Sequence, residues 1–400
     1  MIQIRGSLMV NVTLFSQILQ YIPRSLFSSV VNKFQTDKHS KGINSWTHLV
    51  TMLFFHFAKT NSVRDTSNGL RSITGNVNHL GIQKMVPSRS SISYINEHRN
   101  WQMFRELYLL LKEFFQKDGL YLQRKKFKDI SRKIYMLDST VITLCLKVFD
   151  WATYRNQKGA IKLHTLLDYD GCLPSYVCMT AGGQSDVRHS QYMILPAHSV
   201  VVMDRGYQSF RMYWQWTERD IYFVTRLKET IHYRSLEERE LPPESAENIM
   251  KDEIIELKEE DTKKDYPNKL RRVAVYDDKQ DRTIIILTNN FSWTAETIAE
   301  LYKQRWSIEI FFKELKQHLK IKSFIGTNEN AMWIQIWTAM ITMLLLRYMR
   351  EIAKYSWNLS NLVGFIRINL FVKMDLLLWL NKPFWPQNQD PKRQEQLEFL

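Results

Sequence analysis

The sequence predicts a mixed α/β protein (α+β or α/β) in which an all-helical segment precedes a strand-rich middle, and helices return near the end. Residues 1–128 show apolar residues every three to four positions, the spacing of amphipathic helices. From about residue 130 the period changes, and short apolar runs bounded by turn residues predict strands. Because 400 residues exceed one ordinary domain, we expect two or three domains.

The charge of the chain points to a polyanionic partner. The formal net charge is +14, and 44% hydrophobic residues suffice for a large core, which excludes a disordered protein. Glu237–Asp265 holds 12 acidic against 5 basic residues, a net of −7, which leaves +21 for the rest of the chain. Residues 1–130 alone hold 18 Lys and Arg against 7 Asp and Glu. This distribution favours nucleic acid first and an anionic membrane surface second.

The N-terminal 128 residues are predicted to form a helical domain. Helical spacing is clear in FSQILQYIPRSLFSSVV and in SWTHLVTMLFFHFAKT. Pro87 and Ser88 predict the start of one long amphipathic helix further on. The basic run Gln123–Asp129 is predicted to be a linker to the next domain.

Cysteine usage and hydropathy favour a cytoplasmic protein without a membrane partner. Cys145, Cys172 and Cys178 lack the spacing of a metal site or a disulfide framework, and a sparse, odd set suits a reducing compartment. The N-terminus shows no secretion signal. The most membrane-like run, Met332–Leu346, has 15 residues and falls short of the ~20 that a span needs. We therefore predict that it is a buried core helix.

The middle of the chain is predicted to be a sheet. KIYMLDSTVITLCL, SVVVMDRGY, IYFVTRLKE and RTIIILTNN predict single strands, and the stretch 159–183 predicts two strands around the turn pair Asp170–Gly171. Residues 230–290 contain an acidic, strand-rich insertion whose charge run is typical of a solvated excursion. The predicted domains are 1–128, then a second domain in two halves, 129–229 and 291–346, separated by the insertion and followed by C-terminal helices and a tail, 347–400.

Three carboxylates are candidates for metal binding. Asp138 in YMLDST and Asp204 in VVMDRGY follow apolar runs, so we expect both at strand ends, and Glu309 belongs to a later helical segment. Mg²⁺ prefers such oxygen ligands, and two ions can activate a nucleophile and stabilise the leaving oxygen of a phosphodiester. The alternative is ordinary: a lone Asp after a strand often forms a turn or a helix cap.

The segment Tyr302–Lys320, YKQRWSIEIFFKELKQHLK, is predicted to be one helix with an unusual face. Steps of 3, 4 and 7 place Tyr302, Arg305, Glu309 and Lys316 within roughly 60°, at about 100° per residue. A phenol, a guanidinium and an ammonium beside a carboxylate could hold phosphates next to a metal ion. The alternative is a solvated lattice of i,i+4 ion pairs.

The order of these features resembles a known family. A strand Asp, a hairpin, a second strand Asp, an insertion and a helix Glu are similar to the DDE transposases, which have a ribonuclease-H-like fold. The spacing Tyr302-x2-Arg305-x3-Glu309-x6-Lys316 is similar to the signature of the insertion-sequence-four family. The resemblance covers roughly residues 130–345, and Ser88–Asn100, SRSSISYINEHRN, resembles part of the helical N-terminal domain of that family.

The resemblance implies roles for particular residues. It implies a catalytic triad of Asp138, Asp204 and Glu309 that holds two Mg²⁺ ions, with Mn²⁺ able to substitute. It also implies DNA contacts by Tyr302, Arg305 and Lys316, and places Lys158, Lys162, His164 and Arg205 near the active site, touching DNA. A basic strand edge is the alternative for Lys158, Lys162 and His164, and a surface turn is the alternative for Arg205.

The activity implied by the resemblance is cut-and-paste transposition. Such an enzyme binds the terminal inverted repeats of an insertion sequence, hydrolyses the phosphodiester at the DNA ends and joins the 3′-hydroxyls to target DNA. We expect it to act as a homodimer on paired ends of double-stranded DNA, in the cytoplasm at the bacterial nucleoid. Two alternatives stay open: a catalytically inactive or repurposed DNA-binding protein, and a stand-alone Mg²⁺-dependent endonuclease.

Two further features leave questions open. Asp186 and His189 could act as a pair in which Asp186 orients His189 as a general base, but no Ser or Cys nucleophile accompanies them, and a helix cap is the better interpretation.

Some relatives hold a flipped nucleobase of the DNA with an aromatic residue on the strand before the signature helix. Here that strand carries only aliphatic residues, and the nearest tryptophans are Trp293 and Trp306. The sequence therefore does not decide whether a DNA hairpin forms.

Overall fold

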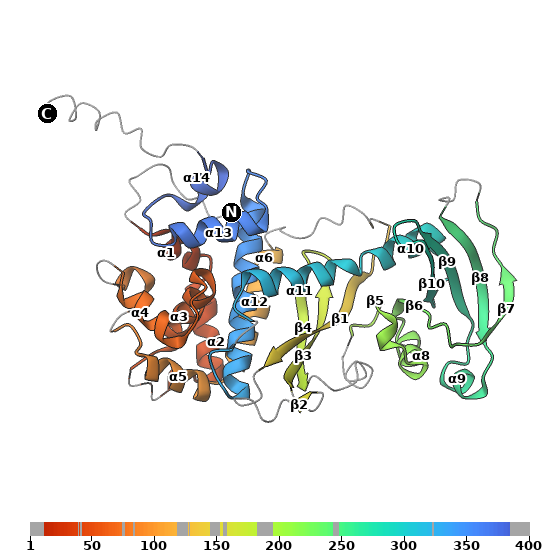
Figure 1. The fold of residues 1–400 in the computed structure, drawn as a ribbon, viewed down its shortest axis with the longest axis horizontal. Helices are drawn as coiled ribbons and strands as arrows, with labels where there is room; N and C mark the ends of the chain where they lie inside the picture. The colour runs from red at the N-terminus through yellow and green to blue at the C-terminus, as the bar shows by residue number, and fades with distance from the viewer. Residues whose placement is uncertain are drawn as a thin grey trace. The chain divides into compact units, whose positions relative to one another are not determined.

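The protein forms two compact units, which we describe separately (Figure 1). The first comprises Met1–Leu120 with Leu315–Leu400, and the second Tyr121–Glu314. The structure is a computed structural model that describes residues 12–38, 40, 42–73, 77–82, 85–117, 127, 129–144, 153–154, 158–181, 195–242, 248–321 and 324–384. Most of the predicted linker Gln123–Asp129, together with Cys145, Asp186 and His189, lies outside these residues.

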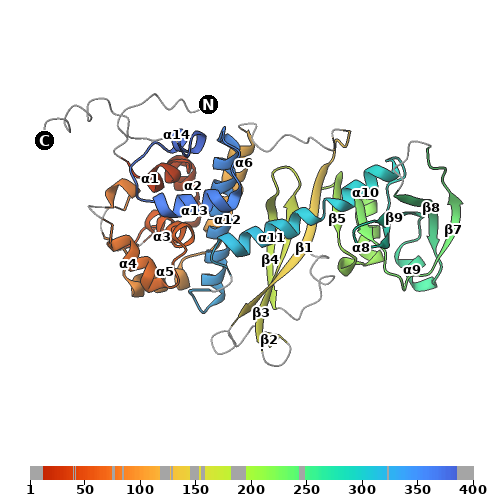
Figure 2. The same ribbon diagram turned by 45° about the horizontal axis from the view of Figure 1, so that its top comes forward.

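The first unit is helical, as the sequence predicts (Figure 2). Its helices are α1 (Leu14–Gln20), α2 (Arg24–Phe34), α3 (Ser45–Ala58), α4 (Val63–Arg71), the short η1 (Asn78–Leu80), α5 (Arg89–His98), α6 (Gln102–Lys117), α12 (Glu329–Ile352), α13 (Leu359–Asn369) and α14 (Leu376–Asn381). Asn44, Ser62 and Ser88 cap α3, α4 and α5 by accepting a hydrogen bond from a main-chain NH. The helix start at Ser88 is confirmed, but the single long helix is wrong, because α5 ends at His98 and α6 begins at Gln102.

Helix α12 is the core of this unit. It contacts α3, α5, α6 and α13, and its residues from Ala331 to Leu346 are buried throughout. By length and composition alone α12 could cross a membrane, but 94% of its apolar window is buried inside the protein. The prediction of a buried core helix for Met332–Leu346 is confirmed. The domains predicted from the sequence assigned this helix to the catalytic half, whereas its contacts are with the N-terminal helices.

The second unit is built on a ten-stranded mixed sheet. The strand order is β2-β3-β1-β5-β6-β10-β9-β8-β7, with β4 also paired to β3. Among the strand pairs that the structure describes, only β1/β5 and β5/β6 are parallel. The strands are β1 (Lys133–Leu144), β2 (Thr153–Tyr154), β3 (Lys158–Asp168), β4 (Leu173–Ala181), β5 (Ser199–Met203), β6 (Tyr222–Arg226), β7 (Tyr233–Glu238), β8 (Ile249–Leu257), β9 (Leu270–Asp277) and β10 (Arg282–Thr288).

The predicted strands are present, and helices pack on the sheet. The hairpin turn between β3 and β4 contains Gly171 at φ +90°, a conformation that favours glycine. Phe210, Tyr213 and Trp216 of α8 (Phe210–Glu218) pack with the apolar residues of β1, β5 and β6. Helix α10 (Ala295–Lys303) contacts β5, β6, β8, β9 and β10. The short α9 (Glu260–Asp265) follows β8, and α11 (Trp306–His318) follows α10.

The acidic insertion is part of the sheet. Strands β7, β8 and β9 extend it beyond β10, so the predicted strand-rich character is confirmed. The expectation of a solvated excursion holds for α9, which buries no residue. It is wrong for β8 and β9, where Asp252, Glu253 and Arg271 are all buried. Their charges are paired across the two strands, which the acidic composition of the segment conceals.

Candidate active site

The two predicted aspartates lie at one edge of the parallel strands. In the parallel β1/β5 pair, Leu137 is the partner of Met203, so Asp138 and Asp204 are the next residue on each strand. Asp204 directly follows β5, as predicted. Asp138 does not end its strand: β1 continues to Leu144 as the antiparallel partner of β3. The edge is therefore the point at which β5 ends while β1 continues beside β3. No feature of the sequence indicates this point.

The predicted signature helix is two helices. Tyr302 is near the end of α10, Glu309 is in the first turn of α11, and Gln304–Arg305 form a turn between them. In this turn the NH of Arg305 donates to the Tyr302 carbonyl, and the NH of Ile308 to the Arg305 carbonyl. Such i→i+3 hydrogen bonds are tighter than those of an α-helix. A single helical register for Tyr302 through Lys316 is therefore wrong.

Arg305 lies between two of the three predicted catalytic acids. Its Nη1 atom is 2.6 Å from Glu309 Oε1 and 3.8 Å from Asp138 Oδ2. Its side chain is only 11% exposed. Burial alone would lower the pKa of Arg305, but the hydrogen bond to Glu309 and the nearby charges of Tyr302, Glu309 and Asp138 raise it. Arg305 therefore stays charged and brings Asp138 close to Glu309, 171 positions further along the chain.

Asp138 is strongly perturbed. Burial raises the pKa of its carboxyl group from 3.8 to about 6, against the lowering effects of the Ser139 NH and of Arg305. Glu309 and Asp204 raise the same pKa by charge repulsion. The Ser139 NH donates to Asp138 Oδ1 at 2.7 Å, which fixes the side chain. The charges of Glu309 and Asp204 therefore both act on Asp138, and a carboxyl group titrating far from its usual range is typical of a functional site.

Tyr302 connects this group to a residue that the sequence analysis missed. Burial raises the pKa of the Tyr302 phenol, Arg305 and Arg226 lower it, and Asp204 raises it. Tyr302 is therefore near both Asp204 and Arg226. Arg226 is the last residue of β6. Because Met203 of β5 is the partner of Thr225, Asp204 and Arg226 are the next residue on each strand and lie at the same edge. Like the two aspartates, it is a polar residue after an apolar run, and that signal could have found it.

The other predicted DNA contacts are placed differently. Lys162 and His164 are the partners of Val141 and Ser139 on β1, and cross-strand partners project to one face, opposite that of Asp138. His164 is fully buried, with Nε2 3.1 Å from Thr180 Oγ1. Buried within the sheet, it is not placed to touch DNA. The structure therefore does not bring Lys162 and His164 together with Asp138.

The remaining predicted residues are near surfaces or outside the described side chains. Lys158 begins β3, and its side chain lies outside the described part of the chain. Arg205 follows Asp204, is half-exposed and approaches Glu229 at 3.9 Å. Arg226 approaches the same carboxylate at 4.0 Å. Lys316 is in the last turn of α11. Arg205, which directly follows Asp204, lies at the edge that carries the aspartates, as Arg226 does.

The two tryptophans near the signature differ in their surroundings. Trp293 precedes α10 and packs edge-on against Tyr222, with ring centroids 5.2 Å apart. Trp306 begins α11, is 51% exposed, and carries the Arg305 guanidinium 5.4 Å from its ring centroid. Trp306 is therefore the tryptophan beside the acids that remains open to solvent.

The carboxylate oxygens around Arg305 are donor atoms that suit a hard divalent cation. Within the described residues, no three His, Cys, Asp or Glu side chains gather closely enough to hold a metal ion. Asp138 and Glu309 instead share the Arg305 guanidinium, which approaches an oxygen of each. Carboxylate oxygens that neutralise a guanidinium are the ligand type that Mg²⁺ prefers. The carboxylates of Asp138 and Glu309 therefore fit a divalent ion by the chemistry of their oxygen atoms.

The raised pKa of Asp138 predicts a pH-dependent cost to stability in the metal-free protein. A carboxyl group raised from 3.8 to about 6 binds its proton more tightly in the folded state. This tighter binding of the proton adds to the free energy of unfolding below pH ~4, and the added stability is lost as the pH rises through about 6. The loss, about 2 pKa units, is on the order of 3 kcal/mol. We expect Asp138→Asn to raise the free energy of unfolding near pH 7.5, measured by urea denaturation, with a smaller gain near pH 5.

The control for this prediction is Asp170→Asn, in the turn between β3 and β4. Asp138→Asn keeps an oxygen that can accept from the Ser139 NH, so it removes the charge with little change in shape. Equal stability of wild type and Asp138→Asn at both pH values would show that the buried carboxylate has no such cost.

Comparison with known proteins identifies the family. A family model described as "Transposase DDE domain" matches residues 130–345, more than half of the chain. The chain belongs to the DDE transposase family. The resemblance noted in the sequence is thus confirmed, and the protein is an enzyme of a family that acts on DNA. A second family model, "Domain of unknown function (DUF4372)", matches residues 10–83 in the helical unit.

Curated relatives are named transposases, two of them for insertion sequence elements. The chain is 30% identical over 246 residues to the "Probable transposase for insertion sequence element IS5377" of Geobacillus stearothermophilus, covering 61% of this chain and 64% of the relative. It is 28% identical to the "Putative transposase y4zB" of Sinorhizobium fredii, over 73% of this chain and 80% of the relative. A "Putative transposase for insertion sequence element IS4SA" of Synechocystis is 25% identical, over 73% of this chain and 81% of the relative.

One solved structure has a related title but little measured likeness. The "Cryo-EM structure of piggyBac transposase synaptic complex with hairpin DNA" aligns with a TM-score of 0.40 and 10% identity, over 96% of this chain and 83% of that chain. A likeness this weak carries no argument about the fold or the DNA complex, and the function of this chain has to be inferred from its own residues.

Proposed function

We propose that this protein is a cut-and-paste transposase that binds the terminal inverted repeats of its own insertion sequence, cleaves the DNA ends and joins them to target DNA. The observation that carries the proposal is the Arg305 guanidinium between Asp138 and Glu309, at 3.8 and 2.6 Å. It approaches two of the three acids that the family resemblance implies. The family implies dependence on a divalent metal, and two Mg²⁺ ions, with Mn²⁺ as substitute, are the finer proposal.

The proposed roles follow from the chemistry of each side chain. Bound divalent ions supply Lewis-acid stabilisation of the charge that develops on the attacking and leaving oxygens of the phosphodiester. Asp138, Asp204 and Glu309 hold the ions. Arg305 and Tyr302, both largely buried beside these acids, hold the phosphates of the DNA end by charge-assisted hydrogen bonds.

Other residues of the chain extend the proposed phosphate contacts. Arg226 and Arg205 stand beside Asp204 and share Glu229 as a weak partner. Because Glu229 is 86% exposed, it can leave when a phosphate approaches. Lys316, the last member of the signature, contacts the DNA backbone further along α11. Lys158 remains a proposed DNA contact.

The finer fold and assembly are also proposals. We infer a ribonuclease-H-like core from the antiparallel strands β4, β3 and β1 joined to the parallel β5 and β6. The helical unit binds the inverted repeats, supported by the excess of 11 positive charges in residues 1–130. The protein acts as a homodimer on paired DNA ends, in the cytoplasm of a bacterium.

The test is cleavage and joining on a labelled duplex that carries the terminal repeats flanking the gene, with and without Mg²⁺. We expect nicked and joined products with Mg²⁺ or Mn²⁺, and none when EDTA removes the metal. End binding without cleavage under any of these conditions would point to a repurposed DNA-binding protein. Cleavage without joining would point to a stand-alone endonuclease.

A further inference from the structure

The insertion contains a buried ion pair that neither the triad nor the signature includes. Asp252 on β8 and Arg271 on β9 have side chains only 5% and 1% exposed. Arg271 donates from Nε to Asp252 Oδ1 at 2.8 Å and from Nη2 to Oδ2 at 2.6 Å. This bidentate geometry fixes the plane of the guanidinium as well as its position.

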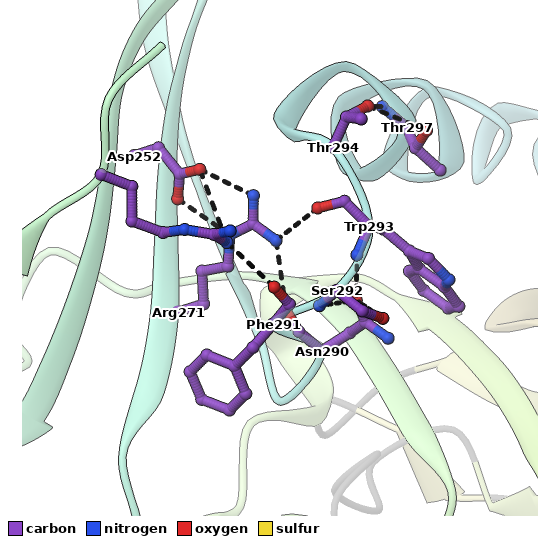
Figure 3. A network of polar contacts seen from close by, with 9 residues as sticks. Asp252, Arg271, Asn290, Phe291, Ser292, Trp293, Thr294 and Thr297 are labelled. Carbon is purple, nitrogen blue, oxygen red and sulfur yellow. Dashed lines mark hydrogen bonds and ion pairs between the residues drawn. The ribbon is translucent and has the colours of Figure 1, made fainter. Parts of the chain in front are cut away.

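The pair holds the segment that leads into α10 (Figure 3). Arg271 Nη1 donates to the carbonyl oxygens of Trp293 at 2.6 Å and Asn290 at 3.4 Å. Arg239, which also lies 3.9 Å from Asp252, donates to the Phe291 carbonyl at 3.1 Å. Three carbonyl groups within four residues therefore accept hydrogen bonds from arginines of the insertion, and all of these donors are organised around one buried carboxylate.

The same segment is fixed on its other side. Asn289 accepts from the Phe223 NH at 3.0 Å and donates to the Ile221 carbonyl at 3.0 Å, which ties it to β6. The Asn290 side chain accepts from the Trp293 NH at 2.8 Å and closes a turn. The segment 289–293 is thus held between the catalytic strands and the insertion.

Helix α10, near whose end Tyr302 lies, comes directly after this segment. Thr294 caps α10, and Tyr302 is near the end of α10, with Arg305 in the turn beyond it. Nine helical residues extend about 13 Å, so a small rotation at Thr294 shifts Tyr302 and Arg305. Their contacts with Asp138 and Asp204 depend on that placement.

We propose that Asp252 and Arg271 are a positioning pair that orients α10, and with it Tyr302, Arg305 and Glu309, against the aspartates of the sheet. The proposal depends on the proposed function for its activity readout. Stability alone does not account for such a pair, because a buried ion pair can often be replaced by apolar residues without loss. Its distinctive property is the set of hydrogen bonds to the carbonyls of 289–293.

The neighbouring pair provides a matched control. Glu253 and Arg272 are direct partners on the same two strands, form an ion pair and are also largely buried, 3% and 13% exposed. Successive residues of a strand point to opposite faces, so this pair faces away from the first. In the part of the chain that the structure describes, its contacts are with Ser235, Lys251 and Tyr233.

The experiment compares two double variants, Asp252→Asn/Arg271→Met and Glu253→Gln/Arg272→Met, with wild type. We measure single-turnover cleavage of the terminal-repeat duplex with Mg²⁺, binding of the same duplex by gel shift, and hydrogen exchange of residues 289–303. We expect both variants to bind the duplex. The first should cleave about 100-fold more slowly, since a misplacement of about 1 Å costs that much, and exchange faster at 289–303. The second should stay within about threefold of wild type.

Equal cleavage rates and equal exchange in the two double variants would overturn the proposal, whether both are slow or both are normal. If the first variant does not fold, Arg271→Lys keeps the charge but lacks the planar fork. Unchanged exchange at 289–303 and unchanged cleavage in Arg271→Lys would also overturn it. If the wild type does not cleave, the proposed function fails, and the exchange comparison still decides whether the pair holds α10.

Discussion

Glu309→Gln should abolish strand cleavage and joining while leaving binding of the terminal-repeat duplex intact. Glutamine keeps the length and shape of the side chain but removes the charge that a divalent cation needs. The variant also leaves Arg305 without its partner at 2.6 Å. Loss of one group that stabilises the charge of the transition state costs about 10²- to 10³-fold in rate, and we expect the loss of a metal ligand to reach at least the upper end of this range. The measurement is single-turnover cleavage with Mg²⁺, with gel-shift binding in parallel.

Glu314→Gln is the control for this prediction, because Glu314 is on the same helix, α11. It removes the same charge from the same helix, five residues further on, so it separates loss of the site from loss of helix charge. Cleavage retained in Glu309→Gln would remove Glu309 from the catalytic triad. Equal losses in both variants would show that the charge of α11, and not the particular carboxylate, matters.

The triad could be found in the sequence because its members follow features with local signals. Asp204 comes after the fully buried strand Ser199–Met203, whose last four residues are apolar, and a polar residue at such a place is conspicuous. Glu309 belongs to a spacing of four polar residues. These are patterns within a few positions, and a sequence states them directly. The family match confirms the resemblance that these patterns carry, and the roles of the three acids stay a prediction.

Features that depend on distant partners were not visible. Asp138 was expected at a strand end because the sequence does not show that β1 continues beside β3 after its pairing with β5 has ended. The break at Gln304–Arg305 was missed because the polar face has a helical period on both sides of it. Arg226 follows an apolar run, but only the pairing of β5 with β6 shows that it lies beside Asp204.

The insertion shows the same limit most clearly. Its composition, 12 acidic against 5 basic residues over Glu237–Asp265, predicts solvation of the charges. Yet Asp252 and Glu253 are buried, because Arg271 and Arg272, on a strand about 20 residues later, form ion pairs with them. Net charge over a window cannot reveal a pair whose second member lies outside it. The buried charges of the insertion are thus a tertiary property.

Arg305→Gln should slow cleavage about 10²- to 10³-fold, the usual cost of removing one donor aimed at developing negative charge. It should also move the acidic limb of the pH–rate profile to higher pH. Arg305 lowers the pKa of Asp138, whose value is about 6 with the guanidinium present. Without Arg305 that pKa rises further, so a higher pH is needed to ionise Asp138. The measurement is single-turnover cleavage across the range from about pH 5 to about pH 9.

Lys303→Gln, an exposed cation two residues earlier, is the matched control, because it removes one positive charge near the same DNA without touching Asp138. It should weaken DNA binding slightly and make the affinity less dependent on salt, yet leave the pH–rate profile in place. Arg305→Lys separates charge from shape: an ammonium restores the field on Asp138 but not the planar fork. We therefore expect Arg305→Lys to recover the position of the acidic limb and only part of the rate. A normal profile in Arg305→Gln would mean that the contact at 3.8 Å does not set the ionisation of Asp138 in the working enzyme.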